Sequence, residues 1–245
     1  MTDIYEKFAR DYDEFGAVEK YSEKEKEFFD GLFKKHNVKT VLDCACGTGR
    51  HLYMFSLSGF DVSGSDYSSA MLDIAAKNMK KHRMKVPLCL CDFRYLEQKY
   101  AETFDAVVCL TTALPHLHAD EDLLLALRSM KNRLNEGGVL VLTQGTTHLT
   151  LTLPSIEVII NREDFSRIFI KEHNGEFQTI RVLDLFHSAE RMESNQYDIV
   201  YRLLLDGDYK RLLEEAGYKN IQVFGDYDMK EYNEKSARLI VIAEC

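Results

Sequence analysis

Three aspartates, Asp43, Asp66 and Asp92, each lie at the end of a short apolar run. The segment 43–49 (DCACGTG) is a turn of small residues before a predicted helix, where a ligand can approach the backbone and unpaired helical N–H groups. Asp66 follows the last glycine of that turn by 17 residues, a spacing typical of an acidic side chain that binds ribose hydroxyls. Asp92 precedes Phe93, and this carboxylate and ring suit the amino group and the face of adenine. The pattern predicts a site for a polar ligand that contains adenosine.

A dinucleotide is the less favoured ligand for this turn. The fingerprint G-x-G-x-x-G requires a third glycine three residues after Gly49, where Leu52 stands instead. A nicotinamide-dependent oxidoreductase is therefore the weakest hypothesis, and binding of NADH alone would establish it.

The aspartates require a sheet whose parallel strands end at one edge. From residue 39 onward, short apolar runs alternate with helical patterns. Strands are predicted over 40–43, 61–65, 86–91, 105–110 and 139–143, helices over 50–57, 68–82 and 121–134, and a turn over 135–138. This order predicts an α/β fold with a Rossmann-like doubly wound sheet of seven strands, the last of them antiparallel.

The rest of the chain completes this fold and decorates it. A single domain is predicted over 1–245, with an N-terminal helical cap (1–38), a ligand-binding core (39–144), a small antiparallel β insertion after the fifth strand (145–206) and a C-terminal part of the core (207–245). Strands are expected in the insertion over 155–160, 165–172, 178–186 and 197–205, followed by a helix over 208–216 and strands over 218–224 and 238–243. The insertion has the size of a substrate lid.

Composition disfavours several function classes. The 245 residues carry a formal net charge of −9, so nucleic acid is an unlikely partner. No apolar run approaches a membrane span, which predicts no membrane association and a cytoplasmic location. The six cysteines include two C-x-C pairs, which we interpret as reduced, buried thiols and not as a metal site.

Four motifs together resemble one enzyme family. These are VLDCACGTGRH (41–51), GSDYS followed by Ala70-Met71-Leu72, CDF (91–93) and FDAVVCLTTALPHL (104–117). They are similar to the successive motifs of class I S-adenosylmethionine (SAM)-dependent methyltransferases. Within that class, the ACGTG turn, the YEKFARDYD start and the β insertion resemble small-molecule enzymes of the glycine/sarcosine N-methyltransferase-like branch.

The resemblance implies that SAM is the cofactor, with S-adenosylhomocysteine (SAH) as product. Asp43 and the turn behind it would hold the methionine end, Asp66 the ribose, and Asp92 with Phe93 the adenine. Arg50 would pair with the methionine carboxylate. The full set of residues implied to bind SAM is Tyr12, Tyr21, Asp43, Ala45, Cys46, Gly47, Gly49, Arg50, Asp66, Tyr67, Met71, Asp92, Phe93, Leu110 and Thr111.

The acceptor side is harder to interpret. The fourth-strand motif lacks the Asn/Asp-Pro-Pro-Tyr/Phe that the class uses on the exocyclic amines of bases and on glutamine amides, which favours N- or O-methylation of a small molecule. His116, after Pro115, is a candidate base or orienting group, although a lone histidine at a strand end is often only structural. Substrate-binding candidates in the insertion are Arg167, His187 and Tyr201.

Other hypotheses remain open from the sequence. One is a protein that binds SAM or SAH without turnover, which methyl transfer to any acceptor would exclude. Another is an RNA methyltransferase, which the net charge disfavours and retention of tRNA or rRNA at physiological salt would support. A monomer and a homodimer are both compatible with the sequence, and no metal is predicted.

Overall fold

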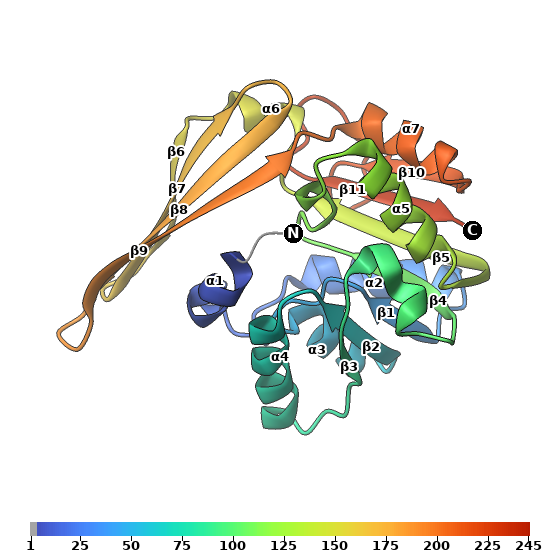
Figure 1. Cartoon of the computed structure of the whole chain (residues 1–245), viewed down its shortest axis with the longest axis horizontal. Helices are drawn as coiled ribbons and strands as arrows, with labels where there is room; N and C mark the ends of the chain where they lie inside the picture. Colours follow the sequence, from blue (N-terminus) through green and yellow to red (C-terminus); the bar gives the residue numbers. More distant parts are fainter. Residues whose placement is uncertain (1–3) are drawn as a thin grey trace.

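The computed structural model describes residues 4–245 and has a seven-stranded sheet at its centre (Figure 1). The strands are β1 (Thr40–Asp43), β2 (Asp61–Asp66), β3 (Leu88–Leu90), β4 (Phe104–Cys109), β5 (Leu134–Gln144), β10 (Lys219–Phe224) and β11 (Leu239–Glu244). Their order is β10-β11-β5-β4-β1-β2-β3, and β11 runs antiparallel to both neighbours. The predicted Rossmann-like sheet with an antiparallel last strand is confirmed. Because the chain crosses from β3 to β4 on the other side of β1, the carboxyl ends of β1 and β4 flank the switch point of the sheet, where such folds bind ligands.

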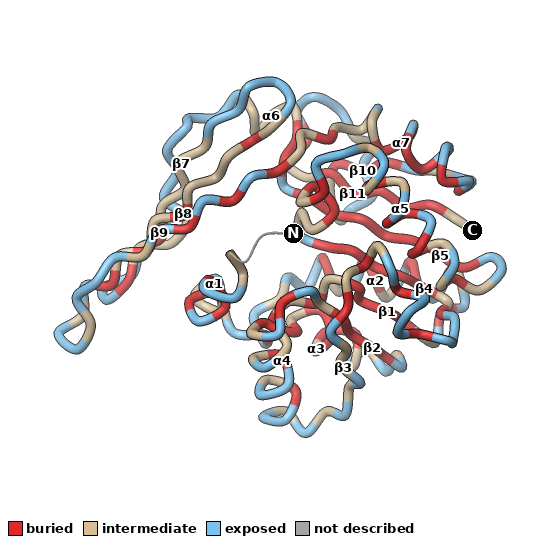
Figure 2. The backbone as a smooth tube through the Cα atoms, viewed as in Figure 1, coloured by how far each residue is buried: buried red, intermediate tan, exposed pale blue. Residues whose placement is uncertain are grey.

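Helices cover both faces of this sheet. One layer contains α2 (Glu23–Lys35), α3 (Arg50–Leu57) and α4 (Ser69–Lys81), and the other contains α5 (Asp120–Lys131) and α7 (Asp206–Glu215). Along β4, Ala106 and Val108 point into the first layer, and Val107 and Cys109 into the second. Figure 2 shows the central strands buried between the two layers. This apolar burial from both sides holds the strand ends that form the site.

Two predicted boundaries around β5 were wrong. Helix α5 ends at Lys131, and residues 135–138, predicted as a turn, lie within β5. The register between β4 and β5 shifts between Phe104 and Ala106, and Gly137 has a φ of 74°. Gly137 and Gly138 therefore lie at an irregularity inside a long strand. A bulge and a turn both favour glycine, so the sequence pattern did not distinguish them.

The insertion forms a separate four-stranded antiparallel sheet that projects from the core (Figure 1). Its strands, in spatial order, are β6 (Ile156–Asn161), β7 (Phe165–His173), β8 (Phe177–His187) and β9 (Met192–Arg202). The prediction missed the start of β9, and it missed α6 (His148–Thr152), which is too short to show helical periodicity. Thr147 and Thr150 cap that helix reciprocally.

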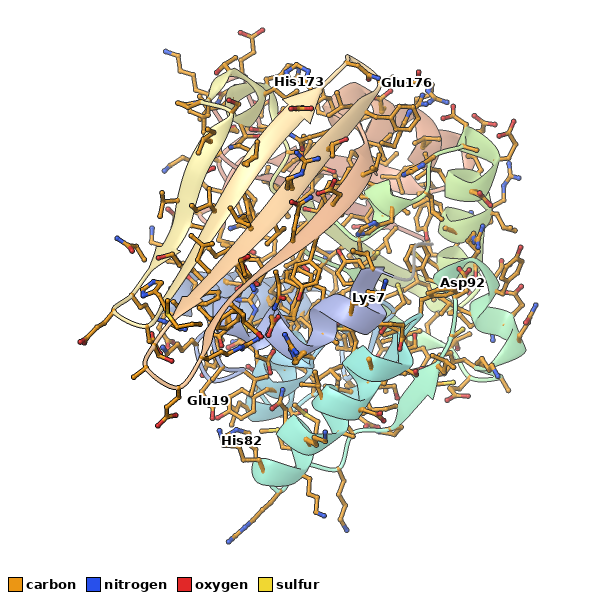
Figure 3. The ribbon with its side chains drawn as sticks, turned by 60° about the vertical axis from the view of Figure 1, so that its left-hand side comes forward. Lys7, Glu19, His82, Asp92, His173 and Glu176 are labelled. Atoms are coloured by element: carbon orange, nitrogen blue, oxygen red, sulfur yellow. The ribbon has the colours of Figure 1, made fainter. Side chains whose placement is uncertain are left out.

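Helix α1 (Ile4–Tyr12) connects the insertion to the core. In Figure 3 it lies across the lower end of the four-stranded sheet and beside α4. On the insertion side, the buried Asp11 carboxylate accepts a hydrogen bond of 2.7 Å from the Tyr197 hydroxyl. On the core side, the Glu6 carboxylate accepts one of 2.7 Å from the Ser68 hydroxyl at the start of α4. The helix is thus held at both ends.

Three further features concern membrane-spanning helices, cysteines and metal-binding groups. Among residues 4–245, no helix combines the length and the apolar character that a membrane crossing requires. All six cysteines are free, and Cys44, Cys46, Cys91 and Cys109 are buried in the apolar layers. Within the same residues, no group of three His, Cys, Asp or Glu is arranged to hold a metal ion.

Candidate active site

The turn after β1 forms the floor of a cleft. The turn is fixed to the neighbouring strand β2, because Cys46 N donates to Ser65 O at 2.9 Å. Gly47 has a φ of 53°, and a Cβ atom built there would meet nothing within 4 Å, so its bare backbone borders open space. Gly49, with a φ of 94°, closes the turn and begins α3. A ligand can therefore lie directly on the backbone in front of a helix N-terminus.

Asp43 lies buried beneath this turn, with 1% of its surface exposed. Its Oδ1 accepts a hydrogen bond from Ala45 N at 3.2 Å, whereas Oδ2 has no partner within residues 4–245. Burial raises the pKa of Asp43 to about 7, because a carboxylate loses its hydration there. An unpaired buried carboxylate oxygen calls for a donor or a cation from a bound ligand.

Asp66, at the end of β2, faces the same cleft. Its two oxygens accept backbone hydrogen bonds from Gly47 N at 2.8 Å and Ser68 N at 2.9 Å. Burial raises its pKa despite these bonds. Since each carboxylate oxygen has two lone pairs, Asp66 can accept two more hydrogen bonds, as a diol would donate.

The structure brings most of the predicted residues together around two adjoining cavities. The narrow cleft at the sheet edge opens beside a larger cavity of about 620 Å³ under the four-stranded sheet. Predicted residues that line one or both are Tyr12, Ala45, Cys46, Gly47, Arg50, Asp66, Tyr67, Met71, Phe93, Leu110, Thr111, His116 and Tyr201. Those that line neither are Tyr21, Asp43, Gly49, Asp92, Arg167 and His187.

Two residues implied to touch SAM are engaged elsewhere. Tyr21 packs against Tyr53, with ring centroids 6.3 Å apart. Asp92, labelled in Figure 3, pairs with the Arg94 guanidinium at 2.6 Å and accepts a hydrogen bond from the backbone N–H of that residue. Phe93 alone of the predicted adenine pair lines the cleft.

Arg50 lines the larger cavity but is also held by a buried acid. Its guanidinium lies 3.2 Å from Glu25, which His51 and Tyr227 also contact. Although burial favours the neutral acid, the hydrogen bond and charge of His51 and the charge of Arg50 lower the pKa of Glu25 to about 2. Glu25 therefore fixes the position of Arg50.

The structure does not bring Arg167 and His187 to the cavities. Arg167 is fully buried and forms two hydrogen bonds, of 2.6 and 2.7 Å, with Asp184. It also donates to the Asp11 carbonyl oxygen at 2.6 Å, so it links the insertion to α1. His187 is exposed and contacts Ser166 at 3.2 Å. The alternation of an isolated strand does not reveal that α1 covers Arg167.

Backbone strain marks the end of β4. Thr111 and Thr112 have φ values of 53° and 68°, which β-branched residues rarely adopt and which cost about 1–3 kcal/mol each. Thr143 of β5 holds both: its hydroxyl accepts from Thr111 N at 3.0 Å and its carbonyl from Thr112 N at 2.8 Å. The strained pair directs the backbone into the cleft, where Leu110 and Thr111 were expected to meet the ligand.

His116 lines the narrow cleft and lies among aromatic residues. Its Nε2 is 2.9 Å from the Tyr5 hydroxyl, and its ring lies 4.7 Å from that of Tyr201. Burial, helped by His118, lowers the pKa of His116 to about 4, so the imidazole is neutral at physiological pH. Tyr5 was missed as a site residue, although it stands seven residues before Tyr12 and hence on the same helix face.

Comparison with known proteins identifies the family. Residues 41–138 match the family model of a methyltransferase domain. A glycine/sarcosine N-methyltransferase from Aphanothece halophytica is 31% identical over 93% of this chain and 84% of its own length. The chain belongs to the class I SAM-dependent methyltransferases.

Solved structures of other methyltransferases share the fold of this chain. A SAM-dependent methyltransferase from Clostridium acetobutylicum has a TM-score of 0.81 and 18% identity, covering 98% of both chains. A SAM-bound amino pentose methyltransferase from Micromonospora echinaspora has a TM-score of 0.74 and 21% identity, covering 100% of this chain and 97% of its own. The predicted family, its glycine/sarcosine-like resemblance and SAM as cofactor are confirmed.

The residues of the methyltransferase cleft fit SAM. The bare Gly47 backbone suits close approach and Asp66 suits a ribose diol. The buried Asp43 carboxylate lines neither cavity but supplies an unpaired acceptor beneath the turn that suits a cationic amino group. When bound, SAM supplies an electrophilic methyl group on its sulfonium. The enzyme transfers this methyl group to a small-molecule acceptor, as predicted.

Proposed function

We propose that this methyltransferase methylates the nitrogen of a small amine and that His116 acts as the base. The observation that supports this best is the neutral imidazole of His116, which Tyr5 holds at the SAM cleft beside Tyr201 of the larger cavity. An amine attacks only as its uncharged form, and its nitrogen must lose a proton during the reaction. A neutral imidazole in a dry aromatic site can accept that proton.

The chain's own residues divide the remaining work. Burial raises the pKa of Tyr5 and Tyr201, so both hydroxyls stay protonated and remain hydrogen-bond donors. In the tautomer that can act as a base, Nε2–H donates to the Tyr5 oxygen, which leaves the Nδ1 lone pair to accept the proton. Helix α1 and the four-stranded sheet exclude water from the space where nitrogen meets methyl carbon.

The relatives support nitrogen over oxygen as the methylated atom. The Aphanothece halophytica protein is named for N-methylation of glycine and sarcosine, and the Micromonospora echinaspora protein acts on an amino pentose. Both names describe amines. The glycine-type and sugar-type acceptors differ in size, so the names leave the acceptor of this chain open.

The proposal is tested in two steps with the full-length protein. Calorimetric titration with SAM and SAH, with NADH as a negative control, measures cofactor binding. Mass spectrometry then follows methyl transfer from labelled SAM to primary and secondary amines, with the corresponding alcohols as matched acceptors. We expect methylated amines and unreacted alcohols. Methylation of the alcohols alone, or tight SAM binding with no transfer to any acceptor, would contradict the proposal.

A further inference from the structure

The larger cavity has a broad apolar wall. Alternate residues of the four-stranded sheet point into it from its inner face, and α1 with the segment after it supplies the opposite side. The apolar lining residues of the sheet are Ile159, Phe169, Ile180, Val182 and Ile199, and those of the N-terminal segment are Phe8 and Phe15. Such a wall binds the apolar body of a ligand and offers little to a purely polar one.

Three polar side chains of the sheet, Glu157, Lys171 and Gln178, interrupt this wall, and Gln178 lies near the start of β8. Gln178 is 3% exposed and lines the cavity. It lies next to the β7–β8 turn, whose position His173 and Glu176 mark at the upper end of the sheet in Figure 3. The Thr146 hydroxyl donates to Gln178 Oε1 at 2.8 Å. This bond leaves Nε2 as the free, donating side of the amide.

A buried chain of hydrogen bonds fixes the position of Gln178. The Tyr209 hydroxyl of α7 donates to Gln144 Oε1 at 2.6 Å, and Gln144 Nε2 donates to the carbonyl oxygens of Thr146 and Leu204 at 2.7 Å each. Thr146 in turn holds Gln178. Within residues 4–245, no acceptor lies within hydrogen-bond distance of Gln178 Nε2. A buried, preorganised donor without a protein partner is suited to a ligand.

The charges near Gln178 favour a neutral ligand group there. Lys171, on the neighbouring strand, pairs with Glu157 at 2.7 Å. Arg50 pairs with Glu25, and Arg238 stacks on Tyr227 beside that acid. Lys171, the cation nearest Gln178 along the sheet, is therefore neutralised, whereas Lys20 lines the cavity from the N-terminal segment. A carboxylate beside Gln178 would lose its hydration without gaining an unpaired positive charge from the neighbouring strand.

We propose that the acceptor is an amine with an apolar or aromatic body and a neutral oxygen at its far end, and that Gln178 Nε2 donates to this oxygen. This inference rests on the proposed N-methylation. A cavity of about 620 Å³ lies within the range of sites that enclose drug-sized ligands, and an acceptor as small as glycine would leave its apolar wall in contact with water. Gln178 thus acts as a specificity residue, and it lies opposite Tyr201 on the neighbouring strand, whose ring is 4.7 Å from that of His116.

Matched amines test the proposal in the full-length enzyme. Tyramine and 4-methoxyphenethylamine carry the proposed oxygen, phenethylamine lacks it, and glycine and sarcosine lack the body. Affinities are measured by calorimetry with saturating SAH, and methylation rates are measured with SAM. We expect an oxygen-bearing amine to bind about tenfold more tightly than phenethylamine, since one buried hydrogen bond contributes about 1 kcal/mol or more.

Two variants and one control sharpen the test. Gln178→Leu should remove the preference for the oxygen while SAM affinity stays unchanged. Ile180→Phe, which fills the cavity, should weaken binding of every aromatic amine at least tenfold. Gln196→Leu, at an exposed glutamine of β9, serves as the control and should change neither.

Three results would overturn the inference: no oxygen-bearing amine binds, Gln178→Leu keeps the preference, or glycine and sarcosine react faster than every aromatic amine. The third result would still leave N-methylation standing. Failure of SAM binding, in contrast, would remove the proposed function itself.

Discussion

The narrow cleft that is expected to bind SAM and the larger cavity beside it differ in how close in the sequence their lining residues are. The cleft is largely a short stretch of backbone, in which the turn after β1 and the end of β2 fall between residues 43 and 71. The larger cavity shares the turn after β1 with the cleft, but its other walls are side chains of α1 and of a sheet more than 140 residues later. A motif describes the first because its parts are local in the sequence. The second exists only after distant segments have packed together.

Replacement of His116, between the two regions, should give the largest effect. We expect His116→Gln to lower kcat by about 100-fold or more, the lower range for loss of a general base, with SAM affinity unchanged. His118→Gln is the matched control, because His118 is exposed, contacts the Val200 carbonyl oxygen and packs against the Phe177 ring. Steady-state kinetics with calorimetry would separate the two effects. Equal kcat values in the two variants would reduce His116 to a structural residue.

A change at Asp43 should affect the SAM cleft alone. Asp43→Asn removes the charge under the turn but keeps an acceptor for Ala45 N. Loss of a charge-assisted hydrogen bond should weaken SAM binding roughly 10- to 100-fold at pH 8 and leave the affinity for the acceptor unchanged. An equal loss of acceptor affinity, measured by titration with SAH present, would show that the two regions are not separate.

The pH dependence of SAM binding gives a second test of Asp43. Because burial raises the pKa of Asp43 to about 7 and a cationic ligand prefers the carboxylate, the affinity should fall as the pH drops below 7. In the absence of ligand the sign is reversed: the raised pKa stabilises the fold below pH about 4, and this stabilisation is lost as the pH rises through 7. Asp43→Asn should therefore unfold at a higher temperature at pH 8 and bind SAM with little dependence on pH between about 5 and 7.

Asp66 should give a smaller, mixed effect. Its two backbone hydrogen bonds mean that Asp66→Ala would also destabilise the turn by about 1–3 kcal/mol, more than its position at a strand end suggested. Asp66→Asn retains one acceptor and should weaken SAM binding about tenfold with less loss of stability. Thermal melts and titrations of both variants would separate the contributions. An unchanged SAM affinity in folded Asp66→Asn would contradict the placement of ribose.

Glu6 connects the two regions and should give the smallest effect. Hydrogen bonds from Ser68 and from backbone N–H groups at the start of α4 lower the pKa of the Glu6 carboxyl. Because the residue is near the surface, Glu6→Gln should raise KM for the acceptor only about two- to fivefold, through looser docking of α1. Hydrogen exchange of the α1 amides should quicken in the variant. Glu14→Gln offers a comparison at an acid that contacts Arg162 in the insertion.

The sequence predicted the parts of the site whose geometry is local. The spacing of Asp43 and Asp66 predicted that both lie at the ends of neighbouring strands, because a strand–turn–helix unit fixes their relative positions. Arg167 was predicted to bind substrate because nothing in strand periodicity shows that α1 covers it. Gln178 resembled any polar strand residue, since its role depends on Thr146 and Tyr209, 32 and 31 residues away in opposite directions. Long-range packing, not residue type, decides such positions.

The two contacts that hold α1, Asp11 with Tyr197 and Glu6 with Ser68, affect the order in which the chain folds during synthesis. Residues 4–12 leave the ribosome first, yet the Tyr197 that holds Asp11 is translated 186 residues later. Because such a contact closes a very long loop, the nascent chain can form β1, β2 and the turn between them well before α1 has its partner. Until β9 has been synthesised, the nascent chain can contain the turn after β1 but not the four-stranded sheet that covers the larger cavity. The cavity is therefore completed only after β9 has been synthesised and has packed against α1.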